Sequence, residues 1–131
     1  MIVITGASGK LGHAIADHAL RRVPSARLAA ASRKPEDLDD LKNRGMDVHA
    51  CDFADPESLG AAFADADKVL IVSVDKLGDE ARTLHRNAIA ACARAGVGRI
   101  FYTSHAGAKP VSSFAPASQH YATEADLAAA G

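Results

Sequence analysis

The stretch that decides the fold is Ile2-Val3-Ile4-Thr5-Gly6-Ala7-Ser8-Gly9-Lys10-Leu11-Gly12. It opens with a β-branched run that is too short for a helix and apolar on both faces, which is typical of a central strand in a parallel sheet. The run passes into a turn with the glycine spacing G-x-x-G-x-x-G, and apolar residues at helical spacing follow from Leu11 to Ala19. The stretch therefore predicts a strand, a tight turn and a helix, the start of a βαβ unit.

The rest of the chain repeats this alternation. Apolar runs predict further strands over residues 27–31, 47–51, 68–74 and 99–103. Periodic or capped segments predict helices over 10–22, 35–44, 56–64, 79–95 and 119–130, with a loop over 105–117. Strands and helices that alternate through short links form a parallel sheet covered on both faces. We predict an α/β fold, a doubly wound Rossmann-like sheet with strand order 3-2-1-4-5 and helices on both faces.

The composition is that of one globular domain. The 131 residues are 48% hydrophobic and 24% charged with a net charge of -1, which excludes a disordered chain. No window holds 18 uninterrupted apolar residues, so we expect no membrane span, and the mixed charges disfavour nucleic-acid binding. The spacing of the six histidines predicts no metal site. Two distant cysteines, read as reduced packing residues, and the lack of a signal-peptide pattern favour the cytoplasm.

The glycine turn predicts a dinucleotide site. Gly6 permits the sharp turn out of the strand, Gly9 lets a pyrophosphate approach the backbone, and Gly12 lets the helix pack closely on the sheet. Free N–H groups and the positive end of the helix dipole then face the phosphates. The alternative is a turn that needs glycine for packing alone, but its place between the first strand and the first helix favours the cofactor.

The end of the second strand predicts which dinucleotide binds. An NAD site commonly has an acidic residue there, which holds the ribose 2′-hydroxyl. This chain has Ser32-Arg33-Lys34 and no acid before Glu36. Arg33 can bind a 2′-phosphate through two hydrogen bonds. A charge-assisted bond of ~1.5–3 kcal/mol shifts selectivity roughly 10- to 100-fold, which predicts NADP(H). The alternative is a solvated basic pair at the start of a helix.

Three further candidates stand at strand ends that face the same crevice, because ligands of such sheets bind at the carboxyl ends of the strands. Asp52 can accept from the adenine amino group, and Phe53 can pack on the base. Ser73 ends the fourth strand beside the expected path of the cofactor. Each has a structural alternative: a turn or N-cap for Asp52, a core anchor for Phe53 and a plain strand-end hydroxyl for Ser73.

The chain resembles the NmrA-like atypical short-chain dehydrogenases, in particular the type 2 NADPH:quinone oxidoreductases. The resemblance spans essentially the whole chain. It rests on the glycine turn of residues 5–12 and on the stretches Ser32-Arg33-Lys34-Pro35, Cys51-Asp52-Phe53, Tyr102-Thr103-Ser104 and His120-Tyr121-Ala122-Thr123-Glu124.

The resemblance implies a role for each candidate. Arg33 holds the 2′-phosphate, Asp52 and Phe53 line the adenine pocket, and Ser73 lies near the nicotinamide ribose. It also implies a cytosolic protein that transfers a hydride from NADPH to a quinone-like acceptor or, as the alternative, a non-catalytic NADP(H)-binding redox sensor. The pyrophosphate lies against Gly6, Ala7, Ser8, Gly9, Lys10 and Leu11.

The sequence departs from the larger superfamily in its proton donor. That superfamily pairs a Tyr with a Lys four residues later, but here Ala106 follows Tyr102 and Ala125 follows Tyr121 at that spacing. Proton transfer by such a pair is therefore not expected, and no catalytic residue is assigned. Four residues near the cofactor end of the sheet are candidates to position substrate or donate a proton, with an ordinary structural role as the alternative: Ser104, His105, Lys109 and Tyr121.

The chain is also shorter than members of that family, which continue past the equivalent of Gly131. We therefore interpret residues 1–131 as an NAD(P)-binding Rossmann domain without the C-terminal substrate region. With five strands, Ile100-Phe101-Tyr102 forms an exposed apolar edge unless the last helix or a second copy covers it. This edge favours association into a homo-oligomer.

Overall fold

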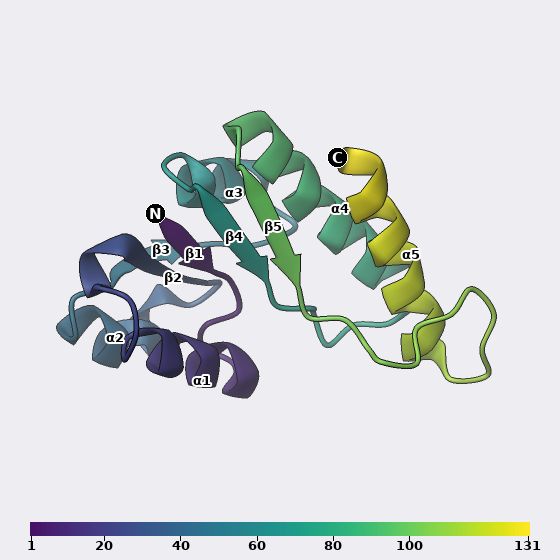
Figure 1. Ribbon diagram of the computed structural model, residues 1–131, viewed down its shortest axis with the longest axis horizontal. Coiled ribbons are helices and arrows are strands. Elements are labelled where there is room, and N and C mark those ends of the chain that lie inside the picture. Colours follow the sequence, from purple (N-terminus) through teal and green to yellow (C-terminus); the bar gives the residue numbers. More distant parts are fainter.

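The computed structural model describes residues 1–131 and contains one five-stranded sheet in the order β3-β2-β1-β4-β5 (Figure 1). All neighbouring strands run parallel, and the order reverses between β1 and β4. The predicted fold class and strand order are confirmed. The strands are β1 (Ile2–Ile4), β2 (Leu28–Ser32), β3 (Asp47–Ala50), β4 (Lys68–Ile71) and β5 (Arg99–Tyr102).

Five α-helices and two 3-10 turns connect these strands. None of the helices has both the length and the apolar character that crossing a membrane requires. The helices are α1 (Lys10–Ala19), α2 (Asp39–Asn43), α3 (Pro56–Phe63), α4 (Gly78–Ala95) and α5 (Ala115–Ala130), and the 3-10 turns are η1 (Ser25–Arg27) and η2 (Pro35–Leu38).

Three helix predictions need correction. Helix α1 ends at Ala19 instead of residue 22, because the amides of Arg21 and Arg22 bond three residues back, to His18 and Ala19. The predicted helix 35–44 divides into η2 and α2. Helix α5 begins at Ala115, inside the segment predicted to be a loop, because Pro116 fits the first helical turn, where no amide hydrogen is needed.

The core has two parts, one on each face of the sheet. Successive strand residues point to opposite faces, so Val69 and Ile71 pack with α3 and α4. Leu28 and Ala30 pack with α1 and α2 on the other face. Although alanine is a weak strand former, every residue of β2 is buried, and this burial outweighs its low propensity.

Strand β5 forms one edge of the sheet. Ile100 and Tyr102 pack on the core beside α4, whereas Phe101 points to the other face and is 46% exposed. Helix α5 lies along α4 (Figure 1) and leaves the ring of Phe101 uncovered. Of the apolar edge predicted for β5, only Phe101 is therefore exposed, because Ile100 and Tyr102 pack on the core and Tyr102 also contacts His120 of α5.

Candidate functional site

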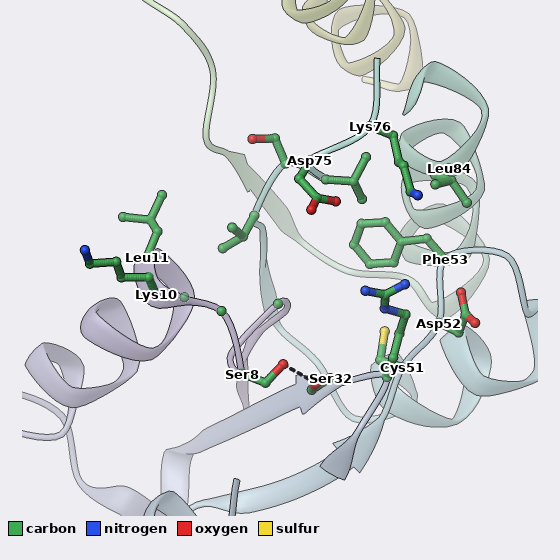
Figure 2. Close-up of a pocket in the computed structure, with 17 residues that line it drawn as sticks. Ser8, Lys10, Leu11, Ser32, Cys51, Asp52, Phe53, Asp75, Lys76 and Leu84 are labelled. Atoms are coloured by element: carbon green, nitrogen blue, oxygen red, sulfur yellow. Dashed lines mark hydrogen bonds between the residues drawn. The ribbon is translucent and has the colours of Figure 1, made fainter. Parts of the chain in front are cut away.

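A cavity of about 380 Å³ opens at the carboxyl ends of the strands. Its walls come from the turn after β1, the ends of β2 and β3, and the segment after β4 (Figure 2). This is where the strand order reverses, the usual ligand site of doubly wound sheets, and the volume suits a small molecule. Ten of the residues predicted from the sequence line it: Gly6, Ser8, Gly9, Lys10, Leu11, Gly12, Arg33, Asp52, Phe53 and Ser73.

The turn after β1 forms a cradle that side chains would fill. Gly6 has a φ of +61°, a conformation that favours glycine. A Cβ on Gly12 would lie 2.1 Å from the carbonyl oxygen of Gly6, so α1 crosses the turn at a distance that only glycine permits. A Cβ on Gly9 would contact only that same oxygen, at 3.3 Å. The backbone at Gly9 is therefore open to a ligand, while Gly6 and Gly12 shape the turn.

The start of α1 offers unused hydrogen-bond donors to this cradle. The N-cap of α1 is Gly9, which supplies no side-chain cap. Amides in the first turn of a helix have no helical acceptor, and the helix dipole places partial positive charge there. Ala7 differs from its neighbours: it is fully buried outside the cavity, and its amide donates to the carbonyl of Ala31. The end of the cavity at α1 is thus suited to a diphosphate.

Two serines connect the phosphate turn to the loop that carries Arg33. The amide of Lys34 donates to Ser32 Oγ at 3.1 Å, and Ser32 Oγ lies 2.6 Å from Ser8 Oγ (Figure 2). Arg33 itself is exposed, and neither an ion pair nor a hydrogen bond occupies its guanidinium. Because Ser32 is buried at 4% exposure, its hydroxyl holds the glycine turn and the Arg33 loop in fixed relation.

The opposite wall is built around Phe53. The ring is 8% exposed and belongs to the hydrophobic core, yet it also lines the cavity. Asn87 Nδ2 donates to the Phe53 carbonyl at 2.9 Å, which fixes this loop to α4. Asp52 accepts from the amide of Ala54 through Oδ1 at 2.9 Å, so it is a turn residue whose second carboxylate oxygen has no partner. Phe53 can therefore be both a core residue and a binding residue, and Asp52 can be both a turn residue and a binding residue.

Ser73 lies beyond the end of β4, because that strand stops at Ile71 and not at residue 74 as predicted. Its amide donates to Thr103 Oγ1 at 2.8 Å, and the Thr103 hydroxyl donates to Ser73 Oγ at 3.1 Å. These bonds connect the ends of β4 and β5. The side chain of Ser73 is therefore placed at the cavity by a residue of the neighbouring strand.

Seven lining residues were not predicted. Three of them lie at a strand end or directly past it, and the rule that ligands bind at carboxyl ends could have indicated them; three more lie three to five residues beyond β4. Leu84 lies on α4, and Figure 2 shows it with Phe53 and Lys76 across the cavity from Lys10. Burial raises the pKa of the Cys51 thiol to about 12, so it stays protonated and unreactive. The seven are Ser32, Cys51, Val72, Val74, Asp75, Lys76 and Leu84.

The four candidates for substrate positioning lie outside this cavity. Ser104 Oγ donates to Glu124, His105 Nδ1 accepts from the amide of Gly107 at 3.0 Å, and the amide of Lys109 donates to Ala117. These bonds order the segment between β5 and α5. Tyr121 is exposed on α5. No three His, Cys, Asp or Glu side chains converge in a geometry that can hold a metal ion.

Comparison with known proteins identifies the family. The family model described as NAD(P)H-binding matches residues 6–130. The chain belongs to this NAD(P)H-binding family. The resemblance to NmrA-like oxidoreductases drawn from the sequence motifs is therefore confirmed.

Individual members of the family agree with this assignment. Quinone oxidoreductase 2 of Escherichia coli (strain K12) is 37% identical over 133 residues, covering 100% of this chain and 45% of that protein. An NmrA-like family domain-containing oxidoreductase of Aspergillus flavus is 30% identical over 78% of the chain and 34% of its own length. The triphenylmethane reductase of Citrobacter sp., solved in complex with NADP(H), has a TM-score of 0.90 at 33% identity, covering 99% of this chain and 46% of that one. The chain thus spans less than half the length of these relatives.

Proposed function

We propose that the cavity binds NADP(H), with the phosphate form preferred over NAD(H). The observation that carries this proposal is the combination of an uncapped helix start in a glycine cradle with an unpaired guanidinium, Arg33, on the same cavity. Lys10 and Lys76 also line the cavity and take part in no ion pair. Cations without protein partners suit a ligand that carries several phosphates.

The candidate residues take distinct parts in this proposal. The turn from Gly6 to Gly12 holds the pyrophosphate through its backbone, and Arg33 pairs with the 2′-phosphate. Asp52 and Phe53 hold the adenine, the first through its free carboxylate oxygen and the second through its ring. Ser73 lies on the β4 side of the cavity, the half that receives the nicotinamide in doubly wound folds.

We further propose that the activity is NADPH-dependent reduction of a quinone-like acceptor. Bound NADPH supplies the hydride. The protein's part is to orient the nicotinamide against the acceptor, because a quinone accepts a hydride readily and can take its proton from solvent. The named quinone oxidoreductase among the relatives supports this acceptor class. We place this activity in the cytoplasm, where free thiols such as Cys51 and Cys92 persist.

One observation favours a second candidate, a non-catalytic NADP(H)-binding regulator. Neither Tyr102 nor Tyr121 lines the cavity. The Tyr102 hydroxyl lies 2.5 Å from Nδ1 of His120, and burial raises the pKa of the phenol to about 12, so it is a poor acid. A site without a proton donor can bind the nucleotide and report its redox state without turnover.

A titration followed by an assay decides between the two functions. NADPH is titrated into the purified chain, with its fluorescence as the measure of binding, and a simple quinone is then added while the absorbance of the reduced cofactor is followed. Binding with turnover supports the oxidoreductase, and tight binding without turnover supports the regulator. A chain that binds neither NADPH nor NADP overturns both.

A further inference from the structure

The cavity is supported from behind by a histidine that no binding role explains. His85 lies on α4, is fully buried, and uses both ring nitrogens. Its Nε2 lies 3.0 Å from the amide of Val74, and its Nδ1 lies 3.0 Å from Thr123 Oγ1 on α5. Burial of both ring nitrogens behind a ligand cavity distinguishes this residue from an ordinary packed histidine.

The hydrogen bonds determine the protonation state of the imidazole. An amide only donates, so Nε2 of His85 must carry a lone pair toward Val74. The Thr123 hydroxyl gives its one proton to the carbonyl of Gln119 at 3.3 Å and therefore accepts from Nδ1–H. His85 is thus the neutral Nδ1–H tautomer. Burial, reinforced by His120, lowers the pKa of His85 to about 4, in agreement with this tautomer.

The bond to Val74 completes a series of three. The amides of Val72, Ser73 and Val74 donate in turn to three side chains, which come from the end of β1, the end of β5 and helix α4. All three residues line the cavity, as do Asp75 and Lys76, whose amides have no acceptor. The imidazole is therefore the last anchor before the free part of this wall. The three acceptors are Thr5 Oγ1, Thr103 Oγ1 and His85 Nε2.

We propose that His85 is a positioning residue for the cofactor: it holds the Val74 amide and thereby the wall formed by residues 72–76, and Thr123 couples α5 to that wall. An apolar residue of similar size would fill the space but leave a buried amide and a buried hydroxyl without their partner. The part of this proposal that concerns NADPH rests on the proposed function. The part that concerns the wall stands on the hydrogen bonds alone.

Two substitutions of His85 separate hydrogen bonding from packing. His85→Gln keeps an acceptor near the position of Nε2, whereas His85→Leu has none. We expect His85→Leu to weaken NADPH binding about 10-fold or more and His85→Gln to stay within about 3-fold of the unsubstituted chain, because an unpaired buried amide costs more than an imperfect bond. Ile89→Ala is the matched control, a cavity-forming change on the same helix that leaves Val74 bonded. It is expected to lower stability but not affinity.

Hydrogen exchange tests the wall without any ligand. In the unsubstituted chain we expect the amide of Val74 to exchange at least about 10-fold more slowly than those of Asp75 and Lys76, which have no acceptor. Thr123→Val keeps the shape of α5 but removes the acceptor of the His85 Nδ1–H. It should accelerate the exchange of Val74, because the ring loses one of its two anchors, and the Nδ1 signal of His85 should shift in the ring nitrogen spectrum.

Three results would overturn the proposal. They are a Val74 amide that exchanges as fast as that of Asp75, a His85→Leu variant with unchanged NADPH affinity, and an Ile89→Ala variant that loses as much affinity as His85→Leu. If His85→Leu does not fold, the exchange of the unsubstituted chain and of Thr123→Val still decides. Failure of the unsubstituted chain to bind NADPH rejects the proposed function, while the exchange measurements separately test the role of His85.

Discussion

The two halves of the molecule hold their parts of the cavity by different means. Around β1, β2 and β3, the elements are held together by close backbone contacts at glycine and by apolar packing. The tightest of these backbone contacts is that of Gly12 with Gly6. Around β4, β5, α4 and α5, buried polar side chains join the elements, among them His85 and Thr123. The comparison shows one half defined by backbone shape and the other by hydrogen bonds between distant residues.

The second half, called the polar half below, also has an ionic contact whose carboxylate is more buried than those of Asp17 and Asp40 in the first half. Asp126 on α5 accepts two hydrogen bonds from Arg82 and two from Arg86, both on α4, at 2.9–3.1 Å. Its carboxylate is 15% exposed. The ion pairs of the first half, such as that of Asp40 with His13, lie in solvent, where they contribute about 0–1 kcal/mol. Loss of one side chain should therefore have different consequences in the two halves.

The largest effect is expected from Gly12→Ala, which changes the first half, around β1, β2 and β3. The added Cβ would lie 2.1 Å from the carbonyl oxygen of Gly6 and 2.7 Å from its carbonyl carbon, and backbone cannot move aside as a side chain can. We expect a loss of about 3 kcal/mol or more in the free energy of unfolding, together with loss of NADPH binding. Urea unfolding and cofactor titration measure the two losses.

The control for Gly12→Ala is Gly60→Ala. Gly60 lies in α3, and a Cβ there would meet no atom within 4 Å. This change should stabilise the chain by about 1 kcal/mol, because alanine is the better helix former. If Gly12→Ala is tolerated as well as Gly60→Ala, then the first half is not defined by the close approach at the turn.

The second prediction tests a proposed ligand contact of the same half. Arg33→Ala should weaken NADPH binding roughly 10- to 100-fold and NADH binding little, because the guanidinium is assigned to the 2′-phosphate alone. Lys34→Ala is the matched control, since an ammonium cannot make the paired bonds of a guanidinium. Fluorescence titration with both cofactors measures the ratio. Equal losses for NADPH and NADH would contradict the assignment.

The contrast between the halves also explains what the sequence could predict. The glycine turn, the strand order and ten of the lining residues follow from local identity and alternation, because Gly6 and Gly12 are required by the backbone itself. The sequence also places His85 within the predicted helix over residues 79–95. Its partners, however, are Val74 and Thr123, which lie 11 and 38 positions away. No local pattern encodes such a pairing.

The same reason explains why the sequence does not predict the start of α5 or the cavity wall after β4. The segment Ala115–Gln119 was predicted mostly as a loop, yet it is helical and contains the buried residues Ala117 and Gln119. Its burial depends on packing against α4, which is invisible before the fold is known. Asp75 and Lys76 line the cavity because the wall after β4 is held from α4 and β5. Tertiary contacts, not propensity, decide these positions.

The third prediction concerns the ionic contact between α4 and α5. Asp126→Asn should lower the free energy of unfolding by about 1–2 kcal/mol, because the amide nitrogen cannot accept the two bonds that one carboxylate oxygen accepts and the other two lose their anionic acceptor. Urea unfolding at neutral pH measures the loss. Asp40→Asn is the control in the first half, and it should change the same quantity by less than about 0.5 kcal/mol, as its pair with His13 is exposed. Equal effects of the two changes would show that the contrast between the halves is not energetic.

The smallest effect is expected on mild acidification, and it should come from the polar half. The folded pKa of His85 is about 4, below the usual 6.5, because burial disfavours the imidazolium, and Tyr102 and His120 beside it offer no negative charge. Between pH 6.5 and 4 the unfolded chain therefore binds a proton that the folded chain does not, so stability falls as the pH falls through this range.

Asp126 extends the same trend to lower pH. Its arginine partners lower its pKa from the usual 3.8 to about 2, so its contribution is present above pH 4 and is lost between pH 4 and 2. Urea unfolding from pH 7 to pH 5 should show a decline that His85→Gln reduces to the contribution of His120, whose pKa burial also lowers, and that Asp126→Asn leaves in place, because Asp126 stays ionised throughout that interval. A decline of unchanged size in His85→Gln would assign the acid sensitivity to groups other than the imidazole of His85.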